Sequence, residues 1–204
     1  MTGLVRRRIL SSNRNPPAQG ATFVPNAIGD NPLARSECFV MLTILIADLA
    51  ETERYGHRLG PLLFPGVVIA LVGQMGAGKT HFTKSVADGL GVRNPAAVNS
   101  PTFVLIQEYP ARLPIYHFDA YRLKNWHEFA DLGAAEYFAG DGVCIVEWAD
   151  KVTEAMPAEY LHIEMSRVDE HRRTWVVRAM GSRHSTLLRE WICPESQLSG
   201  QVLA

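Results

Sequence analysis

The sequence has few cysteines, almost no net charge and no long apolar run, and each shortage excludes a class of protein. Its three cysteines, Cys38, Cys144 and Cys193, lie far apart and form no C-x-x-C pair, which argues against a zinc site and a disulfide framework. A net charge of -1 gives no general basic field for a nucleic acid backbone. No apolar run reaches the ~20 residues that span a bilayer. We therefore expect a cytoplasmic globular protein that makes no membrane contact.

The first forty residues lack the pattern of a folded domain. Three arginines at residues 6–8 precede only a short apolar stretch, and residues 11–32 are rich in Ser, Asn, Pro and Gly. A secretory or twin-arginine export signal needs a longer apolar segment soon after its basic residues. We expect residues 1–40 to be a disordered extension, residues 41–193 to form the folded domain and residues 194–204 to be a flexible tail.

Apolar runs alternate with helical patterns over the folded region, as in an α/β fold. Residues 67–72 form a continuous β-branched and aliphatic run, which is typical of a strand buried on both faces of a parallel sheet. Two later runs, residues 160–167 and 174–179, flank a polar turn and predict a C-terminal antiparallel hairpin. The other strand-like runs cover residues 42–47, 103–108, 115–119 and 143–147, and helical patterns cover residues 52–63, 80–90, 128–138 and 185–192. The pattern predicts a mostly parallel sheet flanked by helices.

A complete phosphate-binding motif lies between a predicted strand and a predicted helix. Residues 73–80, GQMGAGKT, satisfy G-x-x-x-x-G-K-[ST] in full. Gly76 and Gly78 leave consecutive backbone N–H groups free to surround a phosphate, and the start of the helix adds partial positive charge. Lys79 neutralises phosphate oxygens, and Thr80 offers a hydroxyl to Mg²⁺. The sequence therefore predicts a P-loop NTPase-like fold that binds a nucleotide with magnesium.

Two other nucleotide classes fit this loop poorly. A dinucleotide-binding G-x-G-x-x-G that starts at Gly76 would need glycine where His81 stands. No [NT]-K-x-D segment, which would select guanine, follows the loop. ATP is thus the expected nucleotide by elimination.

Phosphoryl transfer also needs a carboxylate at the end of a neighbouring strand. Asp119 ends the run at residues 115–119, and Glu147 ends the run at residues 143–147. Both are candidate magnesium or water-positioning groups. The hydroxyl-bearing loop at residues 99–102 fits a γ-phosphate-sensing loop and an ordinary turn before a strand equally well.

Five motifs that occur in order resemble the TsaE (YjeE) family of small ATPases in bacterial tRNA threonylcarbamoyladenosine synthesis. They lie at residues 76–80, 100–103, 116–123, 132–138 and 146–148. The resemblance spans residues 43–188, outside the first forty. It implies an ATPase with weak or partner-dependent activity that works with the TsaD and TsaB subunits of the threonylcarbamoyl transferase. Contact with tRNA would then be indirect, through that complex.

The resemblance also implies roles for single residues. Thr80 and Glu147 would bind Mg²⁺, and Asp119 would support metal or water positioning. With Lys79, these two acids form the implied catalytic set, and the loop at residues 99–102 would respond to the nucleotide. The implied nucleotide-binding residues are Gly76, Ala77, Gly78, Lys79, Thr80, His81 and Arg172.

The sequence departs from the family pattern at three positions. His81 replaces a second threonine, Gln74 an acidic residue and Ala149 a proline. His81 could alter contacts to the α-phosphate, whereas the main-chain contacts of the loop do not depend on these side chains. Two other functions remain open: a small-molecule kinase, which would need an acceptor pocket, and a nucleotide-gated binding module without appreciable turnover.

Overall fold

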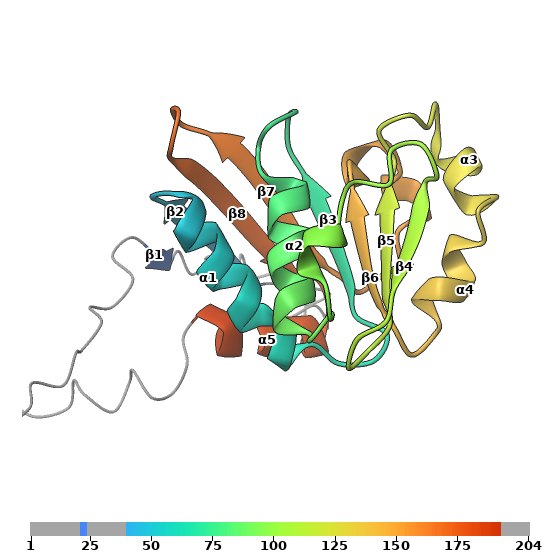
Figure 1. Cartoon of the computed structure of the whole chain (residues 1–204), viewed down its shortest axis with the longest axis horizontal. Helices are drawn as coiled ribbons and strands as arrows, with labels where there is room; N and C mark the ends of the chain where they lie inside the picture. The colour runs from blue at the N-terminus through green and yellow to red at the C-terminus, as the bar shows by residue number, and fades with distance from the viewer. Residues whose placement is uncertain (1–20, 24–39, 193–204) are drawn as a thin grey trace, which may run out of the picture.

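The computed structural model describes residues 21–23 and 40–192, which form one eight-stranded sheet with helices on both faces (Figure 1). The strands are β1 Ala21–Phe23, β2 Val40–Ile46, β3 Val68–Val72, β4 Ile106–Tyr109, β5 Ile115–Asp119, β6 Val143–Glu147, β7 Leu161–Arg167 and β8 Arg173–Ala179. The α-helices are α1 Leu49–Leu59, α2 Lys79–Gly89, α3 Trp126–Ala130, α4 Ala134–Phe138 and α5 Ser182–Ile192. Short 3-10 turns lie at Gly60–Leu62, Pro95–Ala97, Ala149–Lys151 and Thr153–Ala155.

The strand order is β1-β2-β8-β7-β3-β6-β5-β4. The four central strands, β7, β3, β6 and β5, run parallel. Strand β8 pairs with β7 as the predicted antiparallel hairpin. Strand β4 forms one edge of the sheet and pairs antiparallel with β5. The α/β fold with a mostly parallel central sheet is therefore confirmed. None of the helices in the described residues has both the length and the apolarity that a bilayer crossing needs.

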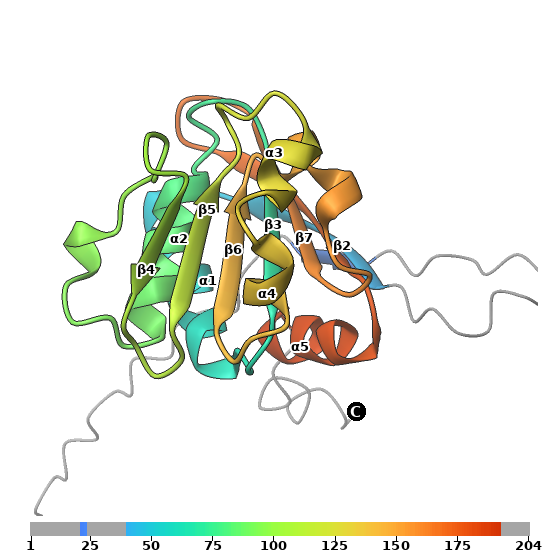
Figure 2. The ribbon, with the colours of Figure 1, turned by 90° about the vertical axis from the view of Figure 1, so that its right-hand side faces the viewer.

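Two apolar layers enclose the sheet. Helices α1, α2 and α5 cover one face, where the largest fully buried side chains are Trp175, Trp191 and Phe82. Helices α3 and α4 cover the other face, over a smaller cluster around Phe118 and Phe129 (Figure 2). Every residue of β6 is buried, as its uninterrupted apolar run predicts for a strand with both faces covered.

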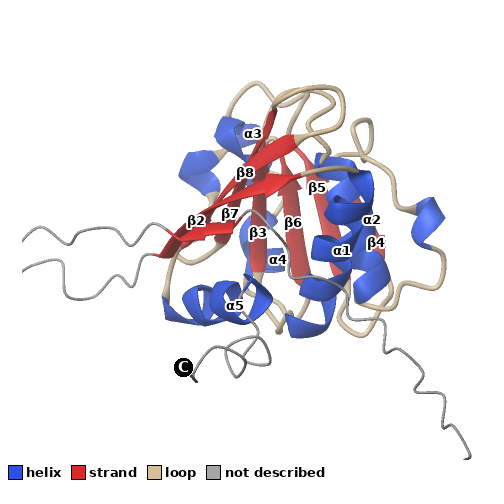
Figure 3. Ribbon diagram, turned by 90° about the vertical axis from the view of Figure 1, so that its left-hand side faces the viewer, coloured by secondary structure: helices blue, strands red, loops and turns tan. Residues whose placement is uncertain are grey.

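Helices α1 and α2 lie side by side and run in the same direction (Figure 3). Their main chains touch at glycines. A Cβ atom at Gly56 would lie 2.5 Å from the Cβ of Ser85, and one at Gly60 would lie 2.4 Å from the carbonyl carbon of Gly89. Since no side chain fits at these points, the helix that follows the phosphate loop is packed directly against the backbone of α1.

The helical pattern predicted around residues 128–138 corresponds to two short helices rather than one. It is split into α3 and α4 because Gly133 adopts a left-handed conformation, with φ of +76°, and ends the first turn before the second begins. The predicted strand at residues 103–108 is also shifted, since Leu105 has a positive φ of +67° and β4 starts only at Ile106.

The predicted terminal segments fall mainly outside the described residues. Residues 1–20, 24–39 and 193–204 are not described, so the predicted disorder there stays a prediction. Ala21–Phe23 differ from the predicted extension, because they form β1 and pair with β2. Strand β2 begins at Val40, one residue before the expected start of the domain.

Candidate functional site

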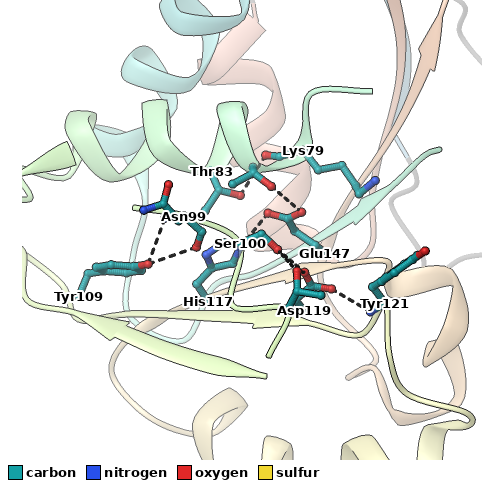
Figure 4. A network of polar contacts seen from close by, with 11 residues as sticks. Lys79, Thr83, Asn99, Ser100, Tyr109, His117, Asp119, Tyr121 and Glu147 are labelled. Atoms are coloured by element: carbon teal, nitrogen blue, oxygen red, sulfur yellow. Dashed lines mark hydrogen bonds and ion pairs between the residues drawn. The ribbon is translucent and has the colours of Figure 1, made fainter. Parts of the chain in front are cut away.

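A pocket of about 350 Å³ lies where β3, β5 and β6 end. Strands β5 and β6 are paired so that Asp119 stands beside Glu147, and Leu71 of β3 stands on the other side of Glu147. The parallel register thus brings the two predicted acids to the edge at which the phosphate loop leaves β3 (Figure 4). The pocket is lined by Met75, Gly76, Gly78, Lys79, Thr80, His81, Ser100, Thr102, Asp119, Tyr121, Glu147 and Trp148.

The phosphate loop has the backbone that its glycines predict. Gly76 and Gly78 have φ values of +76° and +107°, which side-chain-bearing residues rarely adopt. Apart from the glycine itself and its two chain neighbours, no heavy atom of the described residues lies within 4 Å of the Cβ position at either glycine, so both positions face open space. The backbone N–H of Ala77 instead donates to the carbonyl of Gln74 at 3.1 Å, and Ala77 itself is buried. The open cradle fits a phosphate group.

The ammonium group of Lys79 is held inside the loop. Its Nζ donates to the carbonyl oxygens of Gly73 at 2.6 Å and Gln74 at 3.1 Å. The indole ring of Trp148 covers the same ammonium, with Nζ 3.8 Å from the ring centroid. Burial lowers the pKa of Lys79, while the negative charges of Glu147 and Asp119 act to raise it. A phosphate in the pocket would meet a cation that is already close to the loop backbone.

Glu147 connects the phosphate loop to the interior of the sheet. Its Oε2 accepts a hydrogen bond from the Thr80 hydroxyl at 2.9 Å, and its Oε1 lies 2.8 Å from Nε2 of His117. Both Glu147 and His117 are buried. Magnesium prefers hard oxygen ligands, and a carboxylate beside a threonine hydroxyl supplies them.

Asp119 is held by three donors. Its Oδ2 accepts hydrogen bonds from the hydroxyls of Ser100 and, at 2.7 Å, Thr102. Its Oδ1 accepts from the backbone N–H of Tyr121 at 2.8 Å. The loop at residues 99–102 therefore contacts one of the two pocket carboxylates directly, which a turn with no relation to the site would not do.

The chemistry of these residues fits Mg²⁺ bound together with a nucleotide. Among the described residues, no group of three His, Cys, Asp or Glu side chains is placed to hold a metal ion by itself. Magnesium does not need such a group, because proteins commonly bind it through one or two carboxylates while substrate phosphates and water complete the coordination. Thr80 and Glu147, with Asp119 nearby, provide such a partial set.

Two residues predicted to contact the nucleotide, Arg172 and His81, have their closest polar contacts outside the pocket. Arg172 lies in the turn between β7 and β8, is about half exposed and pairs with Asp169, with 2.6 Å between Nε and Oδ2. It is not among the pocket-lining residues. His81 does line the pocket, and its Nε2 lies 3.2 Å from Oε1 of Glu53 on α1. His81 also borders a groove of about 900 Å³ along α1 and α2.

Sequence reasoning gave no role to His117 or Tyr121. Tyr121 contributes its backbone N–H to Asp119, and its ring lies 4.9 Å from that of Trp148. His117 could have been found from the alternation of side chains along a strand, since residues two apart share a face and His117 is two residues before Asp119.

Comparisons with known proteins agree with one another. A family model described as "Threonylcarbamoyl adenosine biosynthesis protein TsaE" matches residues 46–175. The Bacillus subtilis "tRNA threonylcarbamoyladenosine biosynthesis protein TsaE" is 47% identical over 141 residues, which cover 69% of this chain and 87% of that protein. The Treponema pallidum protein of the same name is 44% identical over 107 residues, 52% of this chain and 78% of that protein. The crystal structure of YdiB from Bacillus subtilis is similar, with a TM-score of 0.64, 35% identity and coverage of 79% of this chain and 98% of that chain.

Proposed function

Because the chain belongs to the TsaE family of tRNA threonylcarbamoyladenosine biosynthesis proteins, we propose that it is a magnesium-dependent ATPase of this pathway. It works with the TsaD and TsaB subunits of the threonylcarbamoyl transferase and meets tRNA only through that complex. Its place of action is the cytoplasm. The observation that carries the proposal is the meeting of Lys79, Thr80 and Glu147 in one pocket at the ends of adjacent parallel strands.

Each part of the pocket has a task in this proposal. The backbone amides of Gly76 and Gly78 and the ammonium of Lys79 bind the β- and γ-phosphates. Thr80 and Glu147 hold Mg²⁺, which supplies neutralisation of the charge that develops on the leaving phosphate.

Asp119 completes the site from the neighbouring strand. Its carboxylate is buried and held by Ser100 and Thr102, so it has one fixed orientation toward the pocket. A carboxylate in this place can accept a hydrogen bond from the attacking water. The loop at residues 99–102 donates hydrogen bonds to the same carboxylate. We therefore expect the conformation of this loop to respond to the γ-phosphate.

The proposal is tested by measuring phosphate release from ATP, with the full chain alone and with TsaB and TsaD added. We expect release mainly in the complex. Transfer to a small acceptor would support a kinase instead, and ATP binding without any release would support a nucleotide-gated binding module.

A carboxamide variant tests the role of Glu147 within that assay. Glu147→Gln keeps the size of the side chain but removes its charge, so we expect ATP binding to persist and phosphate release to fall by about a hundredfold or more. Glu154→Gln, at an exposed position after β6, is the matched control. Wild-type phosphate release in Glu147→Gln would contradict the assignment of this acid.

A further inference from the structure

His117 is a polar side chain that the proposed reaction does not yet use. It lies in the middle of β5 with no exposed surface. Its Nε2 is 2.8 Å from Oε1 of Glu147, and its Nδ1 has no hydrogen-bond partner among the residues that the structure describes. Burying an imidazole in a sheet is costly unless its polar atoms are used. The contact with Glu147 is therefore the polar interaction that accounts for a histidine at this position.

The contact fixes which nitrogen of His117 carries hydrogen. An ionised carboxylate only accepts hydrogen bonds, so Nε2 must be the donor. A hydrogen on Nδ1 would point into the protein without an acceptor among the described residues. The Nε2–H tautomer satisfies both conditions.

The two oxygens of Glu147 are divided between two directions. Oε1 faces His117 inside the sheet, and Oε2 faces the Thr80 hydroxyl at the start of α2. Figure 4 shows His117 and Asp119 on the same strand below Glu147; Asp119 lines the pocket and His117 does not. A donor at Oε1 restrains rotation of the carboxylate and leaves Oε2 facing Thr80, the other residue that would hold magnesium.

We propose that His117 is a positioning residue that orients Glu147 for magnesium. The proposal rests on the proposed binding of magnesium with ATP, and it assigns His117 no contact with the nucleotide. Groups that hydrogen-bond to a metal-binding side chain fix its orientation, and their loss typically weakens metal affinity by about 10–100-fold. A merely space-filling histidine would be replaceable by an apolar side chain of similar size.

Three variants of the full chain separate these roles. His117→Phe fills the space without a donor, His117→Gln carries a neutral N–H donor that can reach the Nε2 position, and Tyr109→Phe is a control. Tyr109 packs near His117, and its hydroxyl contacts the backbone of Asn99 rather than Glu147. Binding of a fluorescent ATP analogue is measured while Mg²⁺ is varied, and again in excess chelator.

We expect His117→Phe to need about 10–100-fold more Mg²⁺ for half-maximal binding. His117→Gln and Tyr109→Phe should stay within about threefold of the wild type, and binding in chelator should be equal in all four proteins. A wild-type Mg²⁺ midpoint in His117→Phe, or an equally weakened His117→Gln, would overturn the proposal. If the wild type itself binds ATP without any magnesium dependence, the proposed function fails instead.

Two further measurements cover a His117→Phe protein that does not fold. His117→Asn places its amide near Nδ1 rather than Nε2, so it should need more Mg²⁺ than His117→Gln; equal midpoints would contradict the proposal. In the nucleotide-free wild type, ¹⁵N NMR with His117→Gln for assignment should show the hydrogen on Nε2. A hydrogen on Nδ1 alone would exclude the hydrogen bond to Glu147 and with it the positioning role.

Discussion

The proposed nucleotide pocket and the aromatic layer beneath α1, α2 and α5 both contain buried side chains, which are charged in the pocket and apolar in the layer. In the pocket, Lys79, Asp119 and Glu147 each contact another polar group. In the aromatic layer, Phe82 and Trp175 pack edge to face at 5.0 Å, and Nε1 of Trp175 has no hydrogen-bond partner among the described residues. Buried charge costs stability unless it is paired, whereas apolar burial provides stability.

This difference predicts that the two regions respond to substitution in separate assays. Changes in the pocket should alter nucleotide binding with little loss of folding free energy. Changes in the aromatic layer should lower the folding free energy and leave the affinity of the folded protein intact.

The largest expected effect is on folding. Trp191 is fully buried, its ring lies 6.0 Å from those of Tyr55 and Phe82, and its Nε1 donates to the Tyr55 carbonyl at 2.8 Å. Trp191→Ala should lower the free energy of unfolding by about 3–5 kcal/mol, measured by urea denaturation. Trp126→Ala, at a half-buried position on α3, should lose less. Equal losses of unfolding free energy in the two variants would show that the aromatic layer does not contribute more stability than the other face of the sheet.

The next effect is on binding alone. Lys79→Ala should weaken ATP binding by at least about a hundredfold, or about 3 kcal/mol, because a buried ammonium close to the phosphates is lost. Calorimetric titration measures the affinity. Lys84→Ala, five residues along α2, is the control and should bind like the wild type. The separation also requires that Lys79→Ala unfold at the same urea concentration as the wild type or a higher one.

Acid should destabilise the aromatic side of the sheet. His184 on α5 is buried against Phe64, and burial, followed by the charge of Arg183, lowers its pKa to about 4. The unfolded chain binds a proton near pH 6.5 and the folded chain does not, so stability is complete above about pH 7 and falls as the pH drops toward 4.

The size of that loss is set by the difference between the two pKa values. The loss of unfolding free energy on acidification reaches up to about 3 kcal/mol. Urea denaturation at a series of pH values, with wild type and His184→Leu compared, isolates this histidine from other acid-sensitive groups. An identical pH dependence in the two proteins would show that folding does not lower the pKa of His184.

The smallest effect is expected outside both regions. Arg172 lies on an exposed turn and pairs with Asp169, so Arg172→Ala should change ATP affinity by less than about fivefold and leave urea denaturation unchanged. Asp169→Asn is the control, because it breaks the same pair and keeps the arginine. A large loss of affinity in Arg172→Ala alone would mean that this turn closes on the nucleotide.

The parts of the fold that the sequence predicted best are those in which local pattern and burial agree. Strands β5 and β6 have the expected bounds because each is one short apolar run that ends in an acid. The phosphate loop was evident because its chemistry requires adjacent residues. The turn at Leu105 and the break at Gly133 were missed, since a positive φ at the first leaves no clear mark in sequence and a lone glycine inside a helical pattern is often tolerated.

The site was predictable residue by residue but not as an arrangement. Asp119 and Glu147 were candidates because each ends a strand, and only the register of β5 against β6 makes them neighbours. The same register places His117 opposite Ile145, so that its ring reaches Glu147 diagonally, in a contact between residues thirty positions apart. Side-chain alternation shows which residues share a face, but the partner across the sheet depends on tertiary pairing.

The glycine contact between α1 and α2 has a mechanical consequence. The main chains are so close at Gly56 and Gly60 that not even a methyl group fits between them, so we expect the two helices to move together. If a nucleotide displaces the start of α2, we expect the displacement to reach the outer surface of α1, where Arg54 and His57 border the long groove. Direct contact between two backbones, rather than a chain of side chains, would then connect the interior of the site with the outer surface of the molecule.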